Sequence, residues 1–146
     1  MKAPVVVRSG EGEKLSVTGG EVRFLCAADK TDRAWSVAEC VMPENSGPPP
    51  HNHAWDEAYY VVDGEFRFKV AEKELIARRG DFVYVPGGTV HAFQALSKTP
   101  ARLLFFDAPA ASGEFFREVA REVKDFPRDA HKMGEIGARH GIQFIR

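Results

Sequence analysis

Alternation of apolar and polar residues is the dominant pattern from residue 5 to residue 107. Residues 65–70 read Glu-Phe-Arg-Phe-Lys-Val, and residues 21–26 alternate in a similar way. Successive side chains of a β-strand point to opposite faces, so a period of two predicts strands that bury one face. The apolar runs are short, and glycine, proline, aspartate or asparagine separates them. Helical periodicity is weak in this region, and the pattern predicts an all-β barrel or sandwich.

Several of the separating residues predict specific turns. Asp63-Gly64 favours a tight hairpin between residues 59–62 and 65–70, because glycine tolerates positive φ. Gly80-Asp81 precedes another strand candidate at residues 82–85. Residues 47–50 include three consecutive prolines, which cannot donate ladder hydrogen bonds. We expect them to form an extended edge segment that leads to His51.

The pattern changes after Pro109. Phe115, Val119 and Val123 recur at helical spacing among charged residues. They predict an amphipathic helix for which Ser112 is a candidate N-cap. A second helix is expected over residues 129–139, with Gly141 as its C-terminal stop and residues 142–145 packing back as a tail.

Length and composition fit one globular domain of residues 1–146. The chain has 146 residues, of which 44% are hydrophobic and 28% charged. We expect a barrel over about residues 1–108 and a C-terminal helical extension over about residues 109–146. No internal repeat is visible, so a second barrel is not expected.

The charge balance excludes several classes of partner. The formal net charge is −1, and no basic block or basic face is evident. Nucleic acid and anionic membranes are therefore not expected as partners, whereas a small molecule or another protein is. The N-terminal apolar run is too short for a signal peptide, and no stretch approaches the ~20 apolar residues of a membrane span. We expect a cytoplasmic protein.

The two cysteines, Cys26 and Cys40, are expected to be free thiols. If residues 21–27 and 34–42 pair as a hairpin, Cys26 should lie opposite a residue near Trp35. Cys40 would then be about five residues, or roughly 16 Å, farther along the strand, which is too far for a disulfide. A redox or metal role is the alternative, but no CxxC spacing supports it.

Metal-binding chemistry is indicated by His51, His53, Glu57 and His91. A strand projects residues i and i+2 to one side, so the two neighbouring histidines can share an ion. On one straight strand Glu57 would lie about 13 Å beyond His53, so a tight reversal at residues 54–56 would have to bring it back on a neighbouring strand. His91 follows the turn formers Pro-Gly-Gly at residues 86–88 and would come from a third strand.

A surface interpretation of the same residues stays open. His51 and His53 could be exposed beside the proline-rich loop, and Glu57 could be a solvated carboxylate. Against this, Glu57 precedes a strongly strand-forming run at residues 58–62, in which an inward carboxylate requires a partner. The remaining histidines, His131 and His140, are interpreted as surface or helix-end residues.

With these residues in place, the chain resembles the cupins, a family of small β-barrel proteins whose two motifs surround a metal. Gly47, His51, His53, Glu57 and Gly64 nearly fill the first motif, with the first glycine displaced by two positions. The second motif is matched in register, except that an alanine replaces its usual asparagine, which is not a metal ligand; the matching positions are Gly80, Pro86, Gly88 and His91, and the replaced one is Ala95. The resemblance implies a jelly-roll barrel that holds one divalent transition metal, Fe, Mn, Ni, Co, Cu or Zn, through His51, His53, Glu57 and His91.

The C-terminal part resembles the extension of small bacterial single-domain cupins similar to quercetin dioxygenases. The matching segments are residues 107–109, 114–119 and 135–142. The family resemblance also implies a homodimer, for which the apolar run at residues 5–7 is a plausible edge strand. A fold of this kind can be kept while the substrate changes, so the resemblance indicates the fold more strongly than the reaction.

Three histidines and one glutamate would leave a metal one or two open positions, which is typical of a catalytic site. The leading hypothesis is a metal-dependent dioxygenase that acts with dioxygen on a flavonol or another enolic or phenolic small molecule, with Glu57 as both ligand and base. The alternatives are a non-oxidative metal enzyme such as a cyclase, isomerase or decarboxylase, and a metal-containing binding protein. An aromatic substrate would be lined by apolar rings, although the same residues could equally be core; the candidates are Tyr59, Phe66, Phe68, Phe93 and Phe105.

Overall fold

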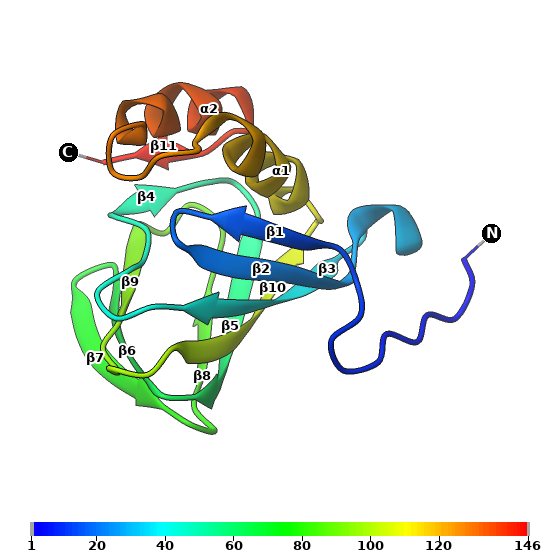
Figure 1. Ribbon diagram of the computed structural model, residues 1–146, viewed down its shortest axis with the longest axis horizontal. Helices are drawn as coiled ribbons and strands as arrows, with labels where there is room; N and C mark the ends of the chain where they lie inside the picture. Colours follow the sequence, from blue (N-terminus) through cyan, green and yellow to red (C-terminus); the bar gives the residue numbers. More distant parts are fainter. Residues whose placement is uncertain (1, 146) are drawn as a thin grey trace.

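The computed structural model describes residues 2–145, and two antiparallel β-sheets packed face to face form its body (Figure 1). One sheet has six strands in the order β1-β2-β3-β10-β5-β8, and the other has five in the order β11-β4-β9-β6-β7. The strands of the first sheet are β1 Lys14–Val17, β2 Gly20–Cys26, β3 Ser36–Met42, β10 Ala101–Ala108, β5 Asp56–Asp63 and β8 Phe82–Val85. Those of the second are β11 Gln143–Phe144, β4 His51–Asn52, β9 His91–Ala95, β6 Glu65–Val70 and β7 Lys73–Arg78. The prediction of an all-β fold with a C-terminal helical part is confirmed.

The apolar side of each alternating strand faces the space between the sheets. In β6, Phe66 and Phe68 are fully buried, whereas the charged residues that alternate with them are exposed or half-buried. The hairpin predicted at Asp63-Gly64 does not form, because β5 and β6 belong to different sheets and do not pair. Asp63-Gly64 is instead the turn by which the chain passes from one sheet to the other, and Gly64 has a φ of +83°. A Cβ there would also lie 2.8 Å from atoms of Ala101 and Ser97, so both the positive φ and the lack of space favour glycine.

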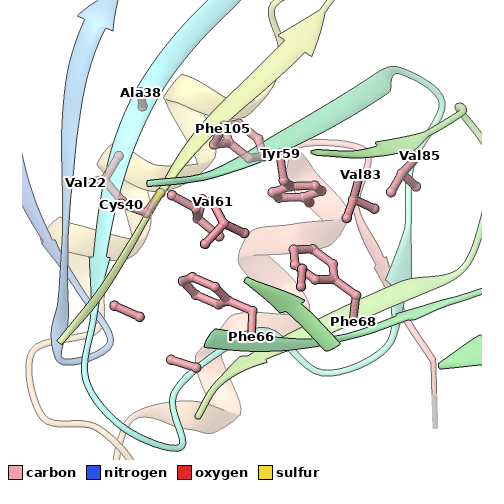
Figure 2. Close-up of a cluster of buried hydrophobic side chains, with 14 of the residues drawn as sticks. Val22, Ala38, Cys40, Tyr59, Val61, Phe66, Phe68, Val83, Val85 and Phe105 are labelled. Atoms are coloured by element: carbon pink, nitrogen blue, oxygen red, sulfur yellow. The ribbon is translucent and has the colours of Figure 1, made fainter. Parts of the chain in front are cut away.

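Buried side chains from both sheets form one continuous core (Figure 2). Burial of this apolar surface is the main favourable contribution to folding. The cluster consists of Val22, Phe24, Ala38, Cys40, Tyr59, Val61, Phe66, Phe68, Ala77, Val83, Val85, Ala95, Ala101, Leu103 and Phe105.

The β2–β3 hairpin exists, but its register differs from the predicted one. Cys26 lies opposite Val37, and Cys40 lies opposite Val22. The pairing shifts at a bulge between Phe24 and Cys26, which sequence alternation does not reveal. Both cysteines are free thiols, as expected.

Two short helices and the tail lie over one end of the barrel, beside β4 (Figure 1). The helices are α1 Ser112–Glu122 and α2 Met133–Arg139, and a 3-10 turn, η2 Ala130–Lys132, precedes α2. The second helix is therefore shorter than predicted, since its first turn is 3-10. Gly141 follows α2 with a φ of +76°, as expected of a helix stop. A second buried cluster joins this part to the barrel and contains Trp55, Phe115, Val119, Val123, Ile136 and Ile142.

Asp107, at the end of β10, holds the start of α1. Its Oδ2 atom accepts hydrogen bonds from the Ala111 and Ser112 amides, both at 2.9 Å, and from the Ser112 hydroxyl at 2.6 Å. Its Oδ1 atom accepts one from the Ser36 hydroxyl. The prediction of Ser112 as N-cap was wrong, because Ser112 is the first helical residue and the carboxylate of Asp107 satisfies the free amides instead.

Residues 2–13 form no helix or strand before β1. Residues 5–7 form no strand, so the edge strand predicted there is absent from the described residues. Val6 is 79% exposed. A short 3-10 turn, η1 Ala28–Lys30, connects β2 to β3. Within residues 2–145, no helix combines the length and apolar character needed to cross a membrane.

Candidate metal centre

Three strands from both sheets bring the four candidate ligands together. His51 lies on β4 directly opposite His91 on β9, His53 follows β4, and Glu57 lies on β5 of the other sheet. One ligand atom from each of the four side chains lies within 4.8 Å of the others. None of the four side chains is more than 7% exposed. The interpretation as exposed histidines and a solvated carboxylate is therefore excluded.

Between His53 and Glu57 the chain crosses from the five-stranded sheet to the six-stranded one, so Glu57 comes from the opposite sheet and not from a neighbouring strand as predicted. The loop of residues 86–88 packs tightly against this crossing. The amide of Gly88 donates to the His53 carbonyl at 2.7 Å, and that of Gly87 donates to Asp56 Oδ1 at 2.8 Å. A Cβ on Gly87 would lie 2.2 Å from the Ala54 carbonyl oxygen, so only glycine allows this approach. The loop thus helps place both His53 and His91.

All three histidines are oriented by backbone carbonyl groups. The Nδ1 atoms of His51, His53 and His91 lie 2.8, 3.1 and 2.8 Å from the carbonyl oxygens of Pro49, Trp55 and Thr89. A carbonyl only accepts, so each Nδ1 carries the proton and donates it. Each Nε2 is thereby the ring nitrogen left to bind a metal, which would take the place of a proton on it.

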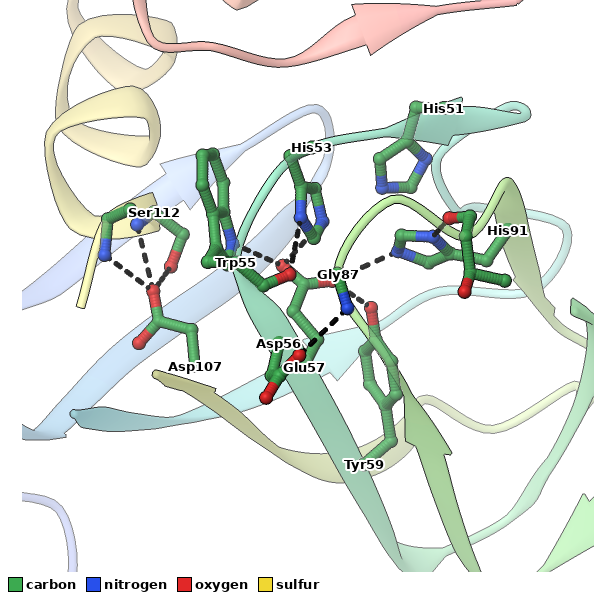
Figure 3. A network of polar contacts seen from close by, with 12 residues as sticks. His51, His53, Trp55, Asp56, Glu57, Tyr59, Gly87, His91, Asp107 and Ser112 are labelled. Atoms are coloured by element: carbon green, nitrogen blue, oxygen red, sulfur yellow. Dashed lines mark hydrogen bonds and ion pairs between the residues drawn. The ribbon is translucent and has the colours of Figure 1, made fainter. Parts of the chain in front are cut away.

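Glu57 lies at the centre of the cluster (Figure 3). Its Oε1 atom is 3.0 Å from His91 Nε2 and accepts a hydrogen bond from the Tyr59 hydroxyl at 2.6 Å. Its Oε2 atom is 3.1 Å from His53 Nε2 and accepts a hydrogen bond from the Trp55 indole N–H at 3.2 Å. The carboxylate is thus held from both sides.

The environment favours the charged form of Glu57 and the neutral form of His51. Burial by itself would raise the pKa of Glu57, but its contacts with His53, His91 and Tyr59 outweigh burial and lower that pKa to about 2. Burial and the neighbouring His91 lower the pKa of His51 to about 4. The site therefore offers an ionised carboxylate on Glu57 and a neutral imidazole on His51, and these are the forms of both groups that bind a metal.

These residues fit one divalent transition metal ion. His53 Nε2 is buried without a properly aligned hydrogen-bond partner, although Glu57 lies close to it. A buried polar atom left in this way is costly unless something else satisfies it. Three imidazole nitrogens and a carboxylate oxygen suit first-row transition metals, and the donor set alone does not distinguish among them.

The aromatic residues expected to line a substrate pocket lie inside the barrel. Tyr59, Phe66, Phe68 and Phe105 are at most 5% exposed, and Phe93 is partly buried. The Tyr59 ring contacts those of Phe68, Phe93 and Phe105 at centroid distances of 5.0 to 5.6 Å. They belong to the barrel core, in which the Tyr59 hydroxyl donates to Glu57, and their role toward a substrate stays a prediction.

Sequence reasoning missed Trp55. Its ring stacks on His53 with centroids 4.1 Å apart and planes 6° from parallel, and its indole reaches Glu57. A tryptophan between two candidate ligands could have been noticed as a signal, since its N–H requires a partner when buried.

Comparison with known proteins finds relatives in sequence and in fold. The sequence model of a cupin domain matches residues 38–107. Quercetin 2,3-dioxygenase of Bacillus subtilis is 30% identical over 118 residues, which are 80% of this chain and 34% of that enzyme. The chain thus corresponds to about a third of the enzyme's length. An uncharacterized protein of Streptomyces coelicolor is 30% identical over 99 residues, or 68% of this chain and 90% of that protein.

Solved structures share the fold. A predicted oxalate decarboxylase from Thermotoga maritima superposes with a TM-score of 0.63 at 25% identity, over 71% of this chain and 98% of that one. The polyketide cyclase RemF from Streptomyces resistomycificus superposes with a TM-score of 0.65 at 18% identity, over 73% and 80% of the two chains.

Proposed function

The chain belongs to the cupin superfamily, and from this premise we propose that it is a metal-dependent dioxygenase of the quercetinase-like type. Its substrates would be dioxygen and a flavonol or another enolic or phenolic small molecule. The observation that carries this proposal is the buried cluster of three histidines and Glu57. The similarity to quercetin 2,3-dioxygenase over 80% of the chain supports the choice of reaction.

A bound divalent ion would supply Lewis acidity toward a substrate hydroxyl and a centre able to support redox chemistry. The protein's own contribution comes from Glu57, which is ionised at neutral pH because its pKa lies at about 2. An ionised carboxylate within hydrogen-bond reach of an enol or phenol hydroxyl can accept its proton. Burial and the charge of Glu57 keep the pKa of Tyr59 well above its usual value, so its hydroxyl stays protonated and keeps donating to Glu57.

Burial of the site bears on how a substrate reaches it. The four candidate ligands are 1 to 7% exposed, so water is largely excluded from the carboxylate and the imidazoles. A substrate can reach them only where this cover opens, and part of the cover is the tail, because β11 pairs with β4 beside His51.

Oxygen consumption tests the proposed reaction. Metal-free protein is reconstituted separately with Fe, Mn, Ni, Co, Cu or Zn and offered a panel of flavonols and other enolic or phenolic compounds. We expect substrate-dependent oxygen uptake with at least one ion, and its loss in Glu57→Gln protein that still binds the metal. Absence of uptake with every ion and substrate would reject the dioxygenase assignment.

A non-oxidative metal enzyme is the second candidate. It is favoured by the 25% identity to the predicted oxalate decarboxylase, of which this chain covers 98%. A decarboxylase, cyclase or isomerase would turn over its substrate without oxygen, so anaerobic product formation separates the two reactions. A metal-containing binding protein is the third candidate, and it would bind a compound from the panel tightly without converting it.

We also propose that two copies pair in a cytoplasmic homodimer. The outer face of the six-stranded sheet carries exposed aromatic residues on β5 and β8, where Tyr60 lies opposite Phe82. Phe82 is 61% and Tyr84 53% exposed. Exposed apolar patches of this kind are typical of protein interfaces. Light scattering of the purified protein measures the molecular mass, and a value of one chain would exclude the dimer.

A further inference from the structure

Trp55 contacts two of the four candidate ligands through three separate interactions. Its indole N–H donates to Glu57 Oε2 at 3.2 Å. Its ring stacks on the His53 imidazole at a centroid distance of 4.1 Å. Its backbone carbonyl lies 3.1 Å from His53 Nδ1 and accepts the proton of that nitrogen. Figure 3 shows the indole beside His53 and its N–H directed toward Glu57. Trp55 therefore contributes to the orientation of both side chains.

The same side chain belongs to the buried cluster of the C-terminal layer, a term used here for α1, α2 and β11 together. Trp55 is 7% exposed and shares that cluster with Val119 of α1 and Ile136 of α2. The backbone after α2 also lies against the indole, because a Cβ on Gly141 would be 3.5 Å from Trp55 Cζ3. Trp55 thus packs against the C-terminal layer and contacts Glu57 and His53.

We propose that Trp55 is a positioning residue that fixes Glu57 and His53 for metal binding and makes that arrangement depend on the docked C-terminal layer. A carboxylate on a flexible side chain has several rotamers, and a donor held in place by packing selects one of them. When the layer is docked, the indole cannot withdraw from Glu57. Displacing the layer frees the indole, and the metal-binding arrangement weakens.

By linkage, metal binding stabilises the docked layer by the same factor. This inference concerns metal binding alone and holds whichever reaction the site catalyses. A negative oxygen-uptake assay would therefore not contradict the role of Trp55. Likewise, parental metal binding in a Trp55 variant would not contradict the proposed reaction.

Cobalt binding to two tryptophan variants provides the first test. Co²⁺ reports its ligand set through visible absorption, so affinity and coordination are measured in one titration. Trp55→Phe keeps an aromatic ring but loses the N–H donor, and we expect about tenfold weaker binding with an altered spectrum. Trp35→Phe is the matched control, since Trp35 is 47% exposed and lies outside the cluster. It should bind Co²⁺ as the parent does. Parental affinity and spectrum in Trp55→Phe would overturn the positioning role.

A double-mutant cycle tests the dependence on the C-terminal layer. Val119 is fully buried in α1 and is none of the candidate ligands, so Val119→Ala loosens the layer without altering the donor set. We expect Val119→Ala to weaken Co²⁺ binding several-fold in the parent and much less in Trp55→Phe protein. Equal effects in the two backgrounds would overturn coupling through Trp55. They would instead indicate the other connection, in which β11 pairs with β4 beside His51.

Fluorescence covers the case in which Trp55→Phe does not fold. In Trp35→Phe protein, Trp55 is the only tryptophan left in the chain. Zn²⁺ does not quench tryptophan by itself, so an emission change reports a change around the indole. We expect Zn²⁺ to alter the emission reversibly, with recovery on chelation. Unchanged emission at saturating Zn²⁺ would contradict the proposed contact between Trp55 and the metal-binding arrangement.

Discussion

Each candidate histidine donates its Nδ1 proton to a carbonyl two residues away in the chain. The orientation of each ring therefore depends on local backbone, whereas the meeting of the three rings depends on the barrel. For His51 and His91 the carbonyl belongs to the residue two positions earlier in the chain, and for His53 it belongs to the residue two positions later. This arrangement presets the tautomer that binds a metal, which lowers the cost of forming the site.

Replacement of the candidate ligands should reduce metal content. His51→Ala and His91→Ala each remove one of the four donors from a buried cluster, and we expect at least about tenfold weaker binding. Elemental analysis of the purified proteins measures the bound ion. His131→Ala is the control, because this exposed histidine lies outside the cluster. Parental metal content in both ligand variants would reject the site.

The Cys40 thiol should be inert in the folded protein. Burial, together with the nearby charges of Glu57 and Glu39, raises its pKa from 9.0 to about 12. The thiolate is the reactive form, so iodoacetamide at pH 8 should modify the half-buried Cys26 well before Cys40. Mass spectrometry of digested protein identifies the labelled residue, and early labelling of Cys40 would be inconsistent with this burial.

The same pKa shift predicts a loss of stability in alkali. The unfolded chain releases the Cys40 proton from about pH 9, and the folded chain holds it until about pH 12. The stabilisation is complete below pH 9 and declines as the pH rises through this window. Urea unfolding at pH 8, 9 and 10 should show a smaller decline in Cys40→Ala protein than in the parent.

At the scale of elements, the junction between barrel and helices depends on one carboxylate. Asp107 is 1% exposed and accepts four hydrogen bonds, three of them from the start of α1. Sequence periodicity predicted the helix but not its anchor, because the anchor lies before the helix and also contacts Ser36 from β3. Only the pairing of β10 with β3 brings Asp107 and Ser36 together.

Removal of this anchor should destabilise the protein strongly. Asp107→Ala leaves buried donors of Ser36, Ala111 and Ser112 without an acceptor, and we expect a loss of about 3 kcal/mol in the free energy of unfolding. Ser112→Ala, which removes only one of the four hydrogen bonds, should cost about 1 kcal/mol. Urea denaturation measures both values. Equal losses in the two variants would contradict the anchoring role of the carboxylate.

The elements themselves were largely predictable. Alternation predicted β2 and β6, and strand-forming composition predicted β5. The turn at Asp63-Gly64 was also predicted, but it joins strands of different sheets and so closes no hairpin. The predictions failed where tertiary contacts determine whether a strand forms or how two strands pair. The apolar residues 5–7 have strand-forming composition, but they pair with no strand among the described residues. The β2–β3 register shifts at a bulge whose position depends on the packing of both sheets.

At the scale of the whole molecule, the metal centre joins the two sheets. Glu57 comes from the six-stranded sheet, and His51 and His91 come from the five-stranded one. The tail adds a further connection, because β11 pairs with β4 and Phe144 lies 5.8 Å from the His51 ring centroid. A bound ion would therefore cross-link both sheets, and the tail would support one of its ligands.

Metal should consequently stabilise the entire fold. Free ion at 100 times its dissociation constant should raise the free energy of unfolding by about 2.7 kcal/mol, provided that the unfolded chain does not bind it. Thermal unfolding with and without Co²⁺ measures the shift. His91→Ala protein should show little or none of it. If Co²⁺ shifted the unfolding of that variant as much as that of the parent, the stabilising ion would have to bind at another site.

The amino-acid sequence by itself determined the strand-rich fold class, the amphipathic helix after Pro109 and the identity of the four candidate ligands. These features depend on local periodicity, turn residues and spacing, which are properties of neighbouring positions in the chain. Only the tertiary structure decided that the four side chains meet in a buried cluster and that Trp55 links two of them to the C-terminal layer. Such contacts join residues from different strands and helices, and their geometry follows from how the two sheets and the C-terminal layer pack together.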